Sequence, residues 1–143
     1  DMVFYKDFVV SSDAFEKMIK ITDELKKAVE ESGIKNGQLL AETAHTTTGI
    51  TVNEGLECLE HDMMQVMRKV VPVNDDYAHA HFLPTYGRTS ANATGHLRGM
   101  LFGNHCHFIV KDGKLALGAA QDAYLVEMDG PQNRKVMISI IGE

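Results

Sequence analysis

The sequence predicts an α+β protein that is mainly β, built as an antiparallel β-sandwich with two or three flanking helices. Three observations favour this class. Runs rich in β-branched and aromatic residues open the chain and fill its C-terminal third, two stretches repeat apolar residues at helical spacing, and turn formers separate the runs. A length of 143 residues suits one domain, which we expect to span residues 1–143.

The composition narrows the class of protein. The hydrophobic share of 44% and the charged share of 24% are those of an ordinary globular protein. A net charge of −6 argues against nucleic acid as a partner, because phosphate binding requires a cationic surface. No run approaches the roughly 18 apolar residues of a membrane span, and no secretory signal opens the chain. We therefore expect a cytoplasmic protein that does not act in a membrane.

The N-terminal part predicts two strands and a helix. Residues 3–10 and 15–21 are rich in apolar and β-branched side chains and predict an opening hairpin. Thr22 or Asp23 then caps a helix, and Gly33 ends it.

The stretch 43–54, TAHTTTGITVNE, predicts a strand around which the rest of the protein is organised. Alternation would place His45, Thr47 and Gly49 on one side of it, and Gly49 marks a bulge or a close approach of another group. One side could form the floor of a polar pocket. The alternative is an ordinary edge strand with an exposed histidine.

Two further helices are expected. Apolar residues from Leu56 to Val70 recur every three or four positions, which predicts an amphipathic helix with Asp62 as its most inward-facing polar residue. Residues 92–101 predict a short helix that turns Leu97, Met100 and Leu101 to the core. Its two glycines, Gly95 and Gly99, would let it approach another backbone closely. Residues 104–117 and 123–141 then predict two hairpins.

The histidines point to a metal site. Imidazole suits zinc and similar ions, and three protein ligands leave a position for water or substrate. No local motif such as HExxH is present, so the ligands would converge from separate elements: His45, His79 or His81, and His96. His105 and His107 form a separate pair on one face of a predicted strand, where they could bind a metal or lie on a solvent or subunit-contact face.

Acidic and basic side chains are available for proton transfer and anion binding. Glu54, Asp62, Glu127 or Asp129 could act as a general base beside a metal-bound water. Glu54 could instead cap a helix, and Asp129 could belong only to a tight turn. Anions would be held by arginines, among them Arg98 and Arg134. Nucleophile motifs and phosphate-binding glycine loops are absent from the sequence.

Six separated motifs, in order, resemble the YjbQ-like family, also called the secondary thiamine-phosphate synthase enzyme family. They are HTTTGITVNE from His45, a helix with Asp62 that closes at Pro72, YAH ending at His79, Asn92 leading to His96, GKLALG at 113–118 followed by Gln121, and EMDGP at 127–131 followed by Arg134.

This resemblance implies a jelly-roll β-sandwich, a compact homotrimer and a histidine-rich pocket for a divalent metal, zinc being the first candidate. It also implies a weak ability to join the pyrimidine and thiazole halves of thiamine phosphate. Carried over by position, the metal ligands are His45, His79 and His96, the amide and acid are Asn53 and Glu54, and the later polar residues are Gln121, Asp129 and Arg134. Ala120 stands where the family usually has tryptophan, and the loop 82–91 is longer than usual. The resemblance therefore does not determine the substrate.

Two functions are therefore compatible with the sequence. The first is a metal-dependent enzyme acting on a small phosphorylated metabolite. In it Glu54 or Asp62 would move the proton, and Thr47, Asn53, Arg98, Gln121, Asp129 and Arg134 would contact the substrate. The second is a non-catalytic protein that binds a metal or a small metabolite in the same pocket.

Overall fold

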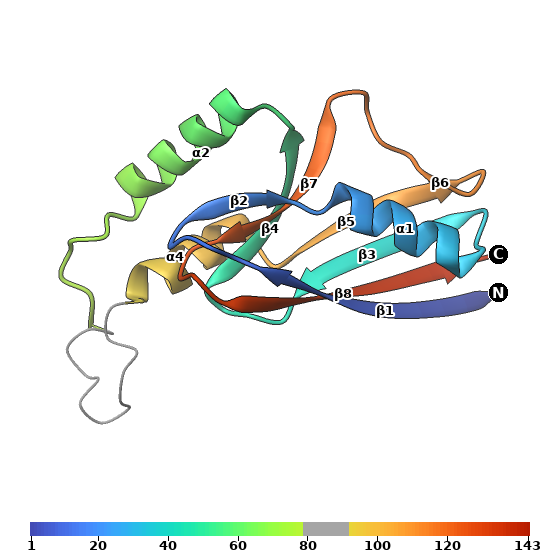
Figure 1. The fold of residues 1–143 in the computed structure, drawn as a ribbon, viewed down its shortest axis with the longest axis horizontal. Helices are drawn as coiled ribbons and strands as arrows, with labels where there is room; N and C mark the ends of the chain where they lie inside the picture. Colours follow the sequence, from blue (N-terminus) through green and yellow to red (C-terminus); the bar gives the residue numbers. More distant parts are fainter. Residues whose placement is uncertain (79–91) are drawn as a thin grey trace.

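The computed structural model describes residues 1–78 and 92–143, and in it two antiparallel sheets pack face to face (Figure 1). The five-stranded sheet has the order β1-β8-β3-β5-β6, and the three-stranded sheet has the order β2-β7-β4. The strands are β1 (Met2–Ser11), β2 (Lys17–Lys20), β3 (Gly37–Thr43), β4 (Thr48–Glu54), β5 (His105–Lys111), β6 (Lys114–Leu115), β7 (Gln121–Glu127) and β8 (Asn133–Gly142). The predicted α+β, mainly antiparallel, sandwich-like fold is confirmed.

Two of the three expected hairpins are wrong, and the reason is the same in both. β1 pairs with β8 and not with β2, while β2 pairs with β7. β7 and β8 are likewise neighbours in sequence but lie in different sheets. At each point the chain crosses from one layer of the sandwich to the other. The turn residues between two strands look alike in the sequence whether the strands form a hairpin or the chain crosses between sheets. The hairpin of β5 and β6 is confirmed.

Three helices are described: α1 (Thr22–Ser32), α2 (Glu57–Val70) and α4 (Ala93–Phe102). Gly33 ends α1 in the left-handed conformation, as predicted. The predicted cap is wrong, because the Thr22 hydroxyl donates to Asp122 Oδ1 (2.6 Å) and accepts from the Ala123 N–H (3.0 Å). In the part of the chain that is described, no helix has the length and apolar character to cross a membrane.

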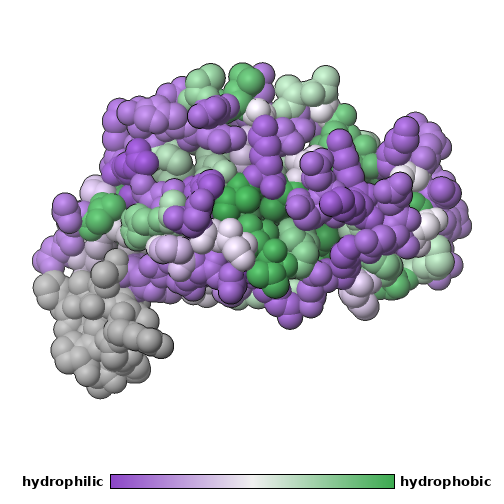
Figure 2. Space-filling model, viewed as in Figure 1, coloured by the Kyte–Doolittle hydropathy of each residue, from purple (hydrophilic) through white to green (hydrophobic). Residues whose placement is uncertain are grey.

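The main core lies between the sheets and against α1. Leu25, Leu39 and Leu125 are among its fully buried side chains. A second, smaller cluster around Tyr124 and Met64 lies between the three-stranded sheet and α2. The visible face of the molecule is largely hydrophilic, with apolar atoms reaching the surface near its middle (Figure 2). The two sheets thus share one core, which fixes where their ends and connections meet.

The inward faces predicted for α2 and α4 need correction. Asp62 is exposed, and Met64 is the buried residue of α2. Met100 and Leu101 are also exposed, whereas Gly95, Arg98 and Gly99 are buried. The apolar stripe of a helix predicts which face is favourable to bury. Which face is buried within one chain also depends on the strands and helices that pack against it.

The two glycines of α4 hold the helix against the strand β4 and its preceding turn. A Cβ atom on Gly99 would lie 3.0 Å from both Thr46 O and Thr48 O. At Gly95 it would lie 2.9 Å from Met128 O. Gly49, on β4, would meet Phe102 at 2.5 Å. The predicted close approaches at all three glycines are therefore confirmed.

We expect Gly99→Ala to lower the free energy of unfolding by about 1–3 kcal/mol, because both oxygens that crowd the new methyl group belong to the backbone. In an unobstructed helix the same change would gain about 1 kcal/mol. Gly118→Ala is the control, since its new Cβ would be 3.4 Å from the nearest atom, Gln121 Oε1. Urea unfolding measures both, and a gain in stability for Gly99→Ala would contradict this packing.

Candidate functional site

The central stretch of the sequence is not one strand but a crossing between the two sheets. β3 ends at Thr43 in the five-stranded sheet, and β4 begins at Thr48 in the three-stranded sheet. Residues 44–47 connect them, and the Thr43 and Thr48 hydroxyls hold the two ends together at 2.7 Å. The predicted alternation of His45 and Thr47 along a strand is therefore wrong. Both residues lie in the crossing instead.

A buried ion pair anchors this crossing. Arg134, at the start of β8, donates through Nε to Glu127 Oε1 (2.8 Å) and through Nη2 to Glu127 Oε2. Nη2 also donates to Thr47 Oγ1 (2.9 Å). The Ser12 hydroxyl donates to Glu127 Oε1 at 2.6 Å. Both charges lie inside the protein, with 2% and 0% of their side chains exposed. The pair thus joins β7, β8, the crossing and the end of β1.

The ionised form of Glu127 is stabilised by its partners. Burial alone would raise the pKa of this carboxyl group, but the hydrogen bonds from Arg134 and Ser12 outweigh it. The Asp129 N–H contributes a further bond of 3.0 Å. The pKa of Glu127 therefore lies below its ordinary value.

His45 is half-buried and held by the backbone of β8. Its Nε2 atom accepts the Lys135 N–H at 2.8 Å. A neutral ring that accepts at Nε2 carries its proton on Nδ1. Burial and the nearby charge of Arg134 lower the pKa of His45, which keeps the ring neutral.

The N-terminal end of α4 lies against the same crossing. A Cβ on Gly95 would be 3.2 Å from the Thr47 side chain, so the helix contacts the crossing at Gly95. His96 is the next residue of the helix. Asn92 Nδ2 donates to Asp129 Oδ2 at 3.1 Å. Two oxygens here, Asn92 Oδ1 and Thr94 Oγ1, are buried and have no hydrogen-bond partner among the described residues. Such atoms are uncommon in native proteins and indicate a missing partner.

We call this region the His45 junction. It gathers several of the predicted site residues, together with two that the sequence did not single out as ligands. Its members are His45, Thr47, Asn92, Thr94, His96, Asp129 and Arg134. The remaining predicted ligand, His79, lies outside the described residues, as does His81. Within residues 1–78 and 92–143, no three histidine, cysteine or acidic side chains come close enough to hold a metal ion.

Other predicted site residues lie elsewhere in the same chain. Glu54 is paired in register with Gln121 at the far end of β4, and Asn53 precedes Glu54. Seven residues of extended strand place this end roughly 20 Å from the His45 junction. Asp62 is exposed on α2. The predicted acids Glu54 and Asp62 are therefore not beside His45 within one chain.

Arg98 is fully buried and engaged in structural contacts. It forms an ion pair with the Glu16 carboxylate and donates from Nη2 and Nε to Val71 O at 3.0 and 3.2 Å. The Glu16 carboxylate also pairs with Arg68 at 2.9 Å, on α2. Arg98 therefore ties α4 to the start of β2 and to the end of α2. Like Arg134, it uses its guanidinium group within the protein.

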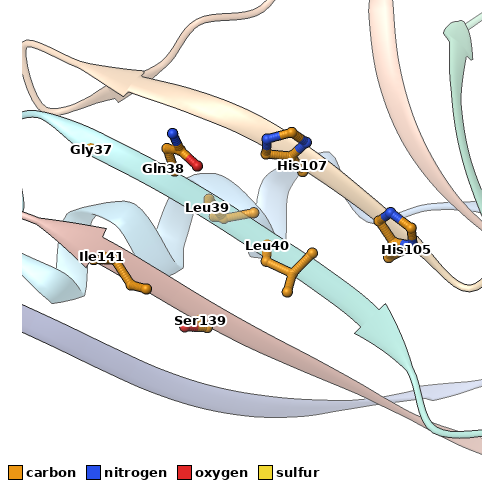
Figure 3. Close-up of a pocket in the computed structure, with 8 residues that line it drawn as sticks. All are labelled: Gly37, Gln38, Leu39, Leu40, His105, His107, Ser139 and Ile141. Carbon is orange, nitrogen blue, oxygen red and sulfur yellow. The ribbon is translucent and has the colours of Figure 1, made fainter.

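A hollow lies on the outer face of the five-stranded sheet, away from the His45 junction (Figure 3). His105 and His107 point outward from β5, and both are exposed, which confirms that they share a face. Leu40 and Ser139 belong to this hollow, of about 580 Å³, and to an adjoining one of about 280 Å³ that reaches β1. We call the two together the sheet-face trough. Its residues are Tyr5, Asp7, Gly37, Gln38, Leu39, Leu40, Glu42, His105, His107, Met137, Ile138, Ser139 and Ile141.

Cys106 does not contribute a reactive site. Cys58 and Cys106 are not joined to each other. Cys106 is buried, and burial raises the pKa of its thiol to about 11. A thiol with such a pKa is protonated at neutral pH and therefore unreactive.

The sequence and the fold both match known proteins. Residues 6–143 match the model of the family described as UPF0047 protein YjbQ-like, and the chain belongs to this family. A UPF0047 protein of Archaeoglobus fulgidus is 37% identical over 125 residues, which are 87% of this chain and 91% of the relative. YugU of Bacillus subtilis is 34% identical over 128 residues, 89% and 91% of the two chains.

Two crystal structures agree with the fold. A YbjQ-like protein of unknown function from Sulfolobus solfataricus superposes with a TM-score of 0.91 at 33% identity, over 99% of each chain. A protein of the same family from Clostridium acetobutylicum gives a TM-score of 0.85 at 34% identity, over 95% of this chain and 99% of its own. These names establish the family and state no activity.

Sequence reasoning missed residues of the junction and of the two buried ion pairs. Ser12 read only as part of a turn, although its hydroxyl donates to a carboxylate more than a hundred positions away. Glu16 lies in the predicted strand 15–21, where no pattern assigns a role to its carboxylate. Thr94 carried no signal, because a threonine near the start of a helix is ordinary. The dipeptide Asp-Gly before Pro131 did mark the turn between β7 and β8, at which the chain crosses from one sheet to the other.

We expect Glu127→Gln to lower the free energy of unfolding by about 3–5 kcal/mol, because it leaves the Arg134 charge buried and unpaired. Asp7→Asn, which breaks the half-exposed pair with Lys135, is the matched control and should cost less than about 1 kcal/mol. Urea unfolding at neutral pH measures both. Equal losses for the two variants would contradict the role given to the buried pair.

The same pair predicts an acid-dependent loss of stability. Because the pKa of Glu127 is lowered by folding, its contribution is complete above its ordinary pKa, near 4.5, and is lost as the pH falls toward the lower value. Thermal unfolding between pH 7 and 3 should therefore show a smaller acid-dependent loss in Glu127→Gln than in wild type. Parallel curves for the two proteins would rule out this assignment.

Proposed function

We propose that this protein binds a divalent metal ion, zinc being the first candidate, at the His45 junction. One observation carries the proposal: the buried oxygens of Asn92 and Thr94 lack partners among the described residues, at the start of the helix that carries His96 and beside the crossing that carries His45. A polar group left without a partner inside a protein is costly, so a bound ion with its waters, or a polar ligand, would relieve that cost.

The donor atoms suit such an ion. Imidazole nitrogen and carboxylate oxygen are common ligands of zinc, and the three proposed protein ligands, His45, His79 and His96, would leave one position for water or substrate. In the geometry described above, Nε2 of His45 accepts the Lys135 N–H. Binding through this nitrogen therefore requires the His45 ring to turn away from β8. The ring is already neutral, as metal binding demands.

The assembly we propose is a homotrimer, and the ligand beside the metal a small phosphorylated metabolite. Both parts come from the family resemblance. Asp129 and the start of α4 would line the pocket, and the helix N-terminus favours an anion. The reaction considered first is the joining of a pyrimidine pyrophosphate to a thiazole phosphate, the reaction in the family's alternative name.

A non-catalytic binding protein is the second candidate, and the geometry of the single chain favours it over an efficient transferase. Arg98 and Arg134, expected to hold the anion, are buried and paired with carboxylates. Glu54 and Asp62, expected to move the proton, lie away from His45. Metal binding does not depend on these four residues, whereas the proposed reaction does.

We expect His96→Ala to lose the bound metal while keeping the fold, because it removes one imidazole from a half-buried helix position. His61→Ala is the matched control, since His61 is an exposed histidine on α2. Each protein would be stripped with chelator, incubated with one equivalent of zinc, desalted and analysed by elemental mass spectrometry. Circular dichroism checks folding. Equal zinc in His96→Ala and wild type would remove His96 from the site.

Activity separates the two candidates. Zinc-loaded wild type would be mixed with the two thiamine precursors, and product would be measured against the stripped protein. Stoichiometric zinc uptake without metal-dependent product favours the binding protein. Metal-dependent product that Glu54→Gln abolishes favours the enzyme, and would place Glu54 near the metal through a neighbouring subunit.

A further inference from the structure

Helix α2 has an apolar stripe that its own chain buries only in part. Met64 is its buried residue, whereas Val66 and Val70 are 52% and 59% exposed. These two valines are four positions apart and therefore lie on the same face of the helix. The surface between α2 and Phe102, at the end of α4, is an open groove of apolar side chains. An amphipathic helix of this kind ordinarily buries its stripe against another element.

The sheet-face trough is a second surface without a cover, and both apolar and polar side chains line it. Across the four strands β1, β8, β3 and β5, Tyr5, Ser139, Leu40 and His107 occupy one row of the register. Tyr5 is 76% exposed and Leu40 is 40% exposed. Helix α1 lies behind this sheet, on its opposite face (Figure 3). A contiguous apolar patch on an open sheet face marks an interaction surface.

The charges beside the two surfaces are complementary. The next row of the trough carries Asp7 and Glu42, on either side of Met137. On α2, the exposed Lys69 follows Val66 by three positions, so the ammonium group lies beside the apolar stripe. Asp7 is already paired with Lys135 at 3.2 Å, so a helix that places Val66 and Val70 in the trough can set Lys69 near the Glu42 carboxylate.

We propose that the stripe of α2 in one subunit docks in the sheet-face trough of a second copy of the same chain. This inference rests on the proposed homotrimer and names the two surfaces that meet in it. They are different patches of one chain, so the contact is of the head-to-tail kind. Such contacts generate rings when the rotation between subunits closes. Three identical contacts would then bury all three helices and all three troughs.

The test uses two variants, each of which damages one surface. Val66→Glu places a carboxylate on the stripe, facing the acidic row of the trough, and Leu40→Glu places one in the floor of the trough. Tyr5→Glu replaces Leu40→Glu if circular dichroism shows that the latter is not folded. His61→Glu is the matched control, since it adds a carboxylate to the opposite, exposed face of α2. Light scattering coupled to size exclusion gives the mass of each.

We expect wild type and His61→Glu to be trimers, and both Val66→Glu and Leu40→Glu to be monomers. Mixing the two monomers should give a complex of two chains, because the intact helix of Leu40→Glu meets the intact trough of Val66→Glu. If wild type is a trimer and either folded variant stays a trimer, the inference is overturned and the homotrimer stands. A mixture that stays monomeric also overturns it. A monomeric wild type would overturn the homotrimer and this inference together.

A charge exchange tests the pairing itself. Lys69→Glu should shift the wild-type trimer toward monomer, and the double variant Lys69→Glu with Glu42→Lys should restore the trimer. Asp112→Lys, on the exposed turn between β5 and β6, replaces Glu42→Lys as the control and should restore nothing. Two results would overturn the placement of Lys69 beside the trough. One is equal recovery of the trimer with Glu42→Lys and with Asp112→Lys, and the other is no recovery with Glu42→Lys.

Discussion

The buried pair of Arg134 and Glu127 is the interaction on which the geometry of the junction depends. It lies where the chain passes between the two layers of the sandwich, and it is completed by Ser12 and Thr47, each from a different segment. A charge taken out of water is tolerated only when its partners are in place. The four segments must therefore adopt one relative position, and the crossing that carries His45 is held rigidly for that reason.

The glycines of α4 extend this constraint to the helix. At Gly95 and Gly99 the helix backbone packs so closely against Thr46, Thr48 and Met128 that an added Cβ atom would be crowded by their backbone oxygens. The side chains at the start of α4 are thereby placed against the crossing, and His96 comes into the same region as His45. Two buried oxygens without partners lie in this region, in a structure whose other polar contacts are largely satisfied among the described residues. The junction is thus held by buried contacts and also contains polar atoms without partners among the described residues.

The surface of the chain has the opposite character. Helix α2 and the outer face of the five-stranded sheet leave apolar side chains exposed, although the core between the sheets is closed. Membership of the YjbQ-like family explains the fold, and the relatives named above share it over almost their whole length.

The sequence by itself determined the class of fold, the family, the three described helices and most of the strands, because period and turn chemistry are local properties. It also identified His45, Thr47, Asp129 and Arg134 as polar residues of note. Only the tertiary structure decided which strands pair, because a turn within one sheet and a crossing between two sheets have similar sequences. It alone showed that Glu54 and Gln121 lie at the other end of β4, and that Arg98 and Arg134 are paired with Glu16 and Glu127. Those contacts join residues far apart along the chain, and their distances follow from packing, which no local pattern records.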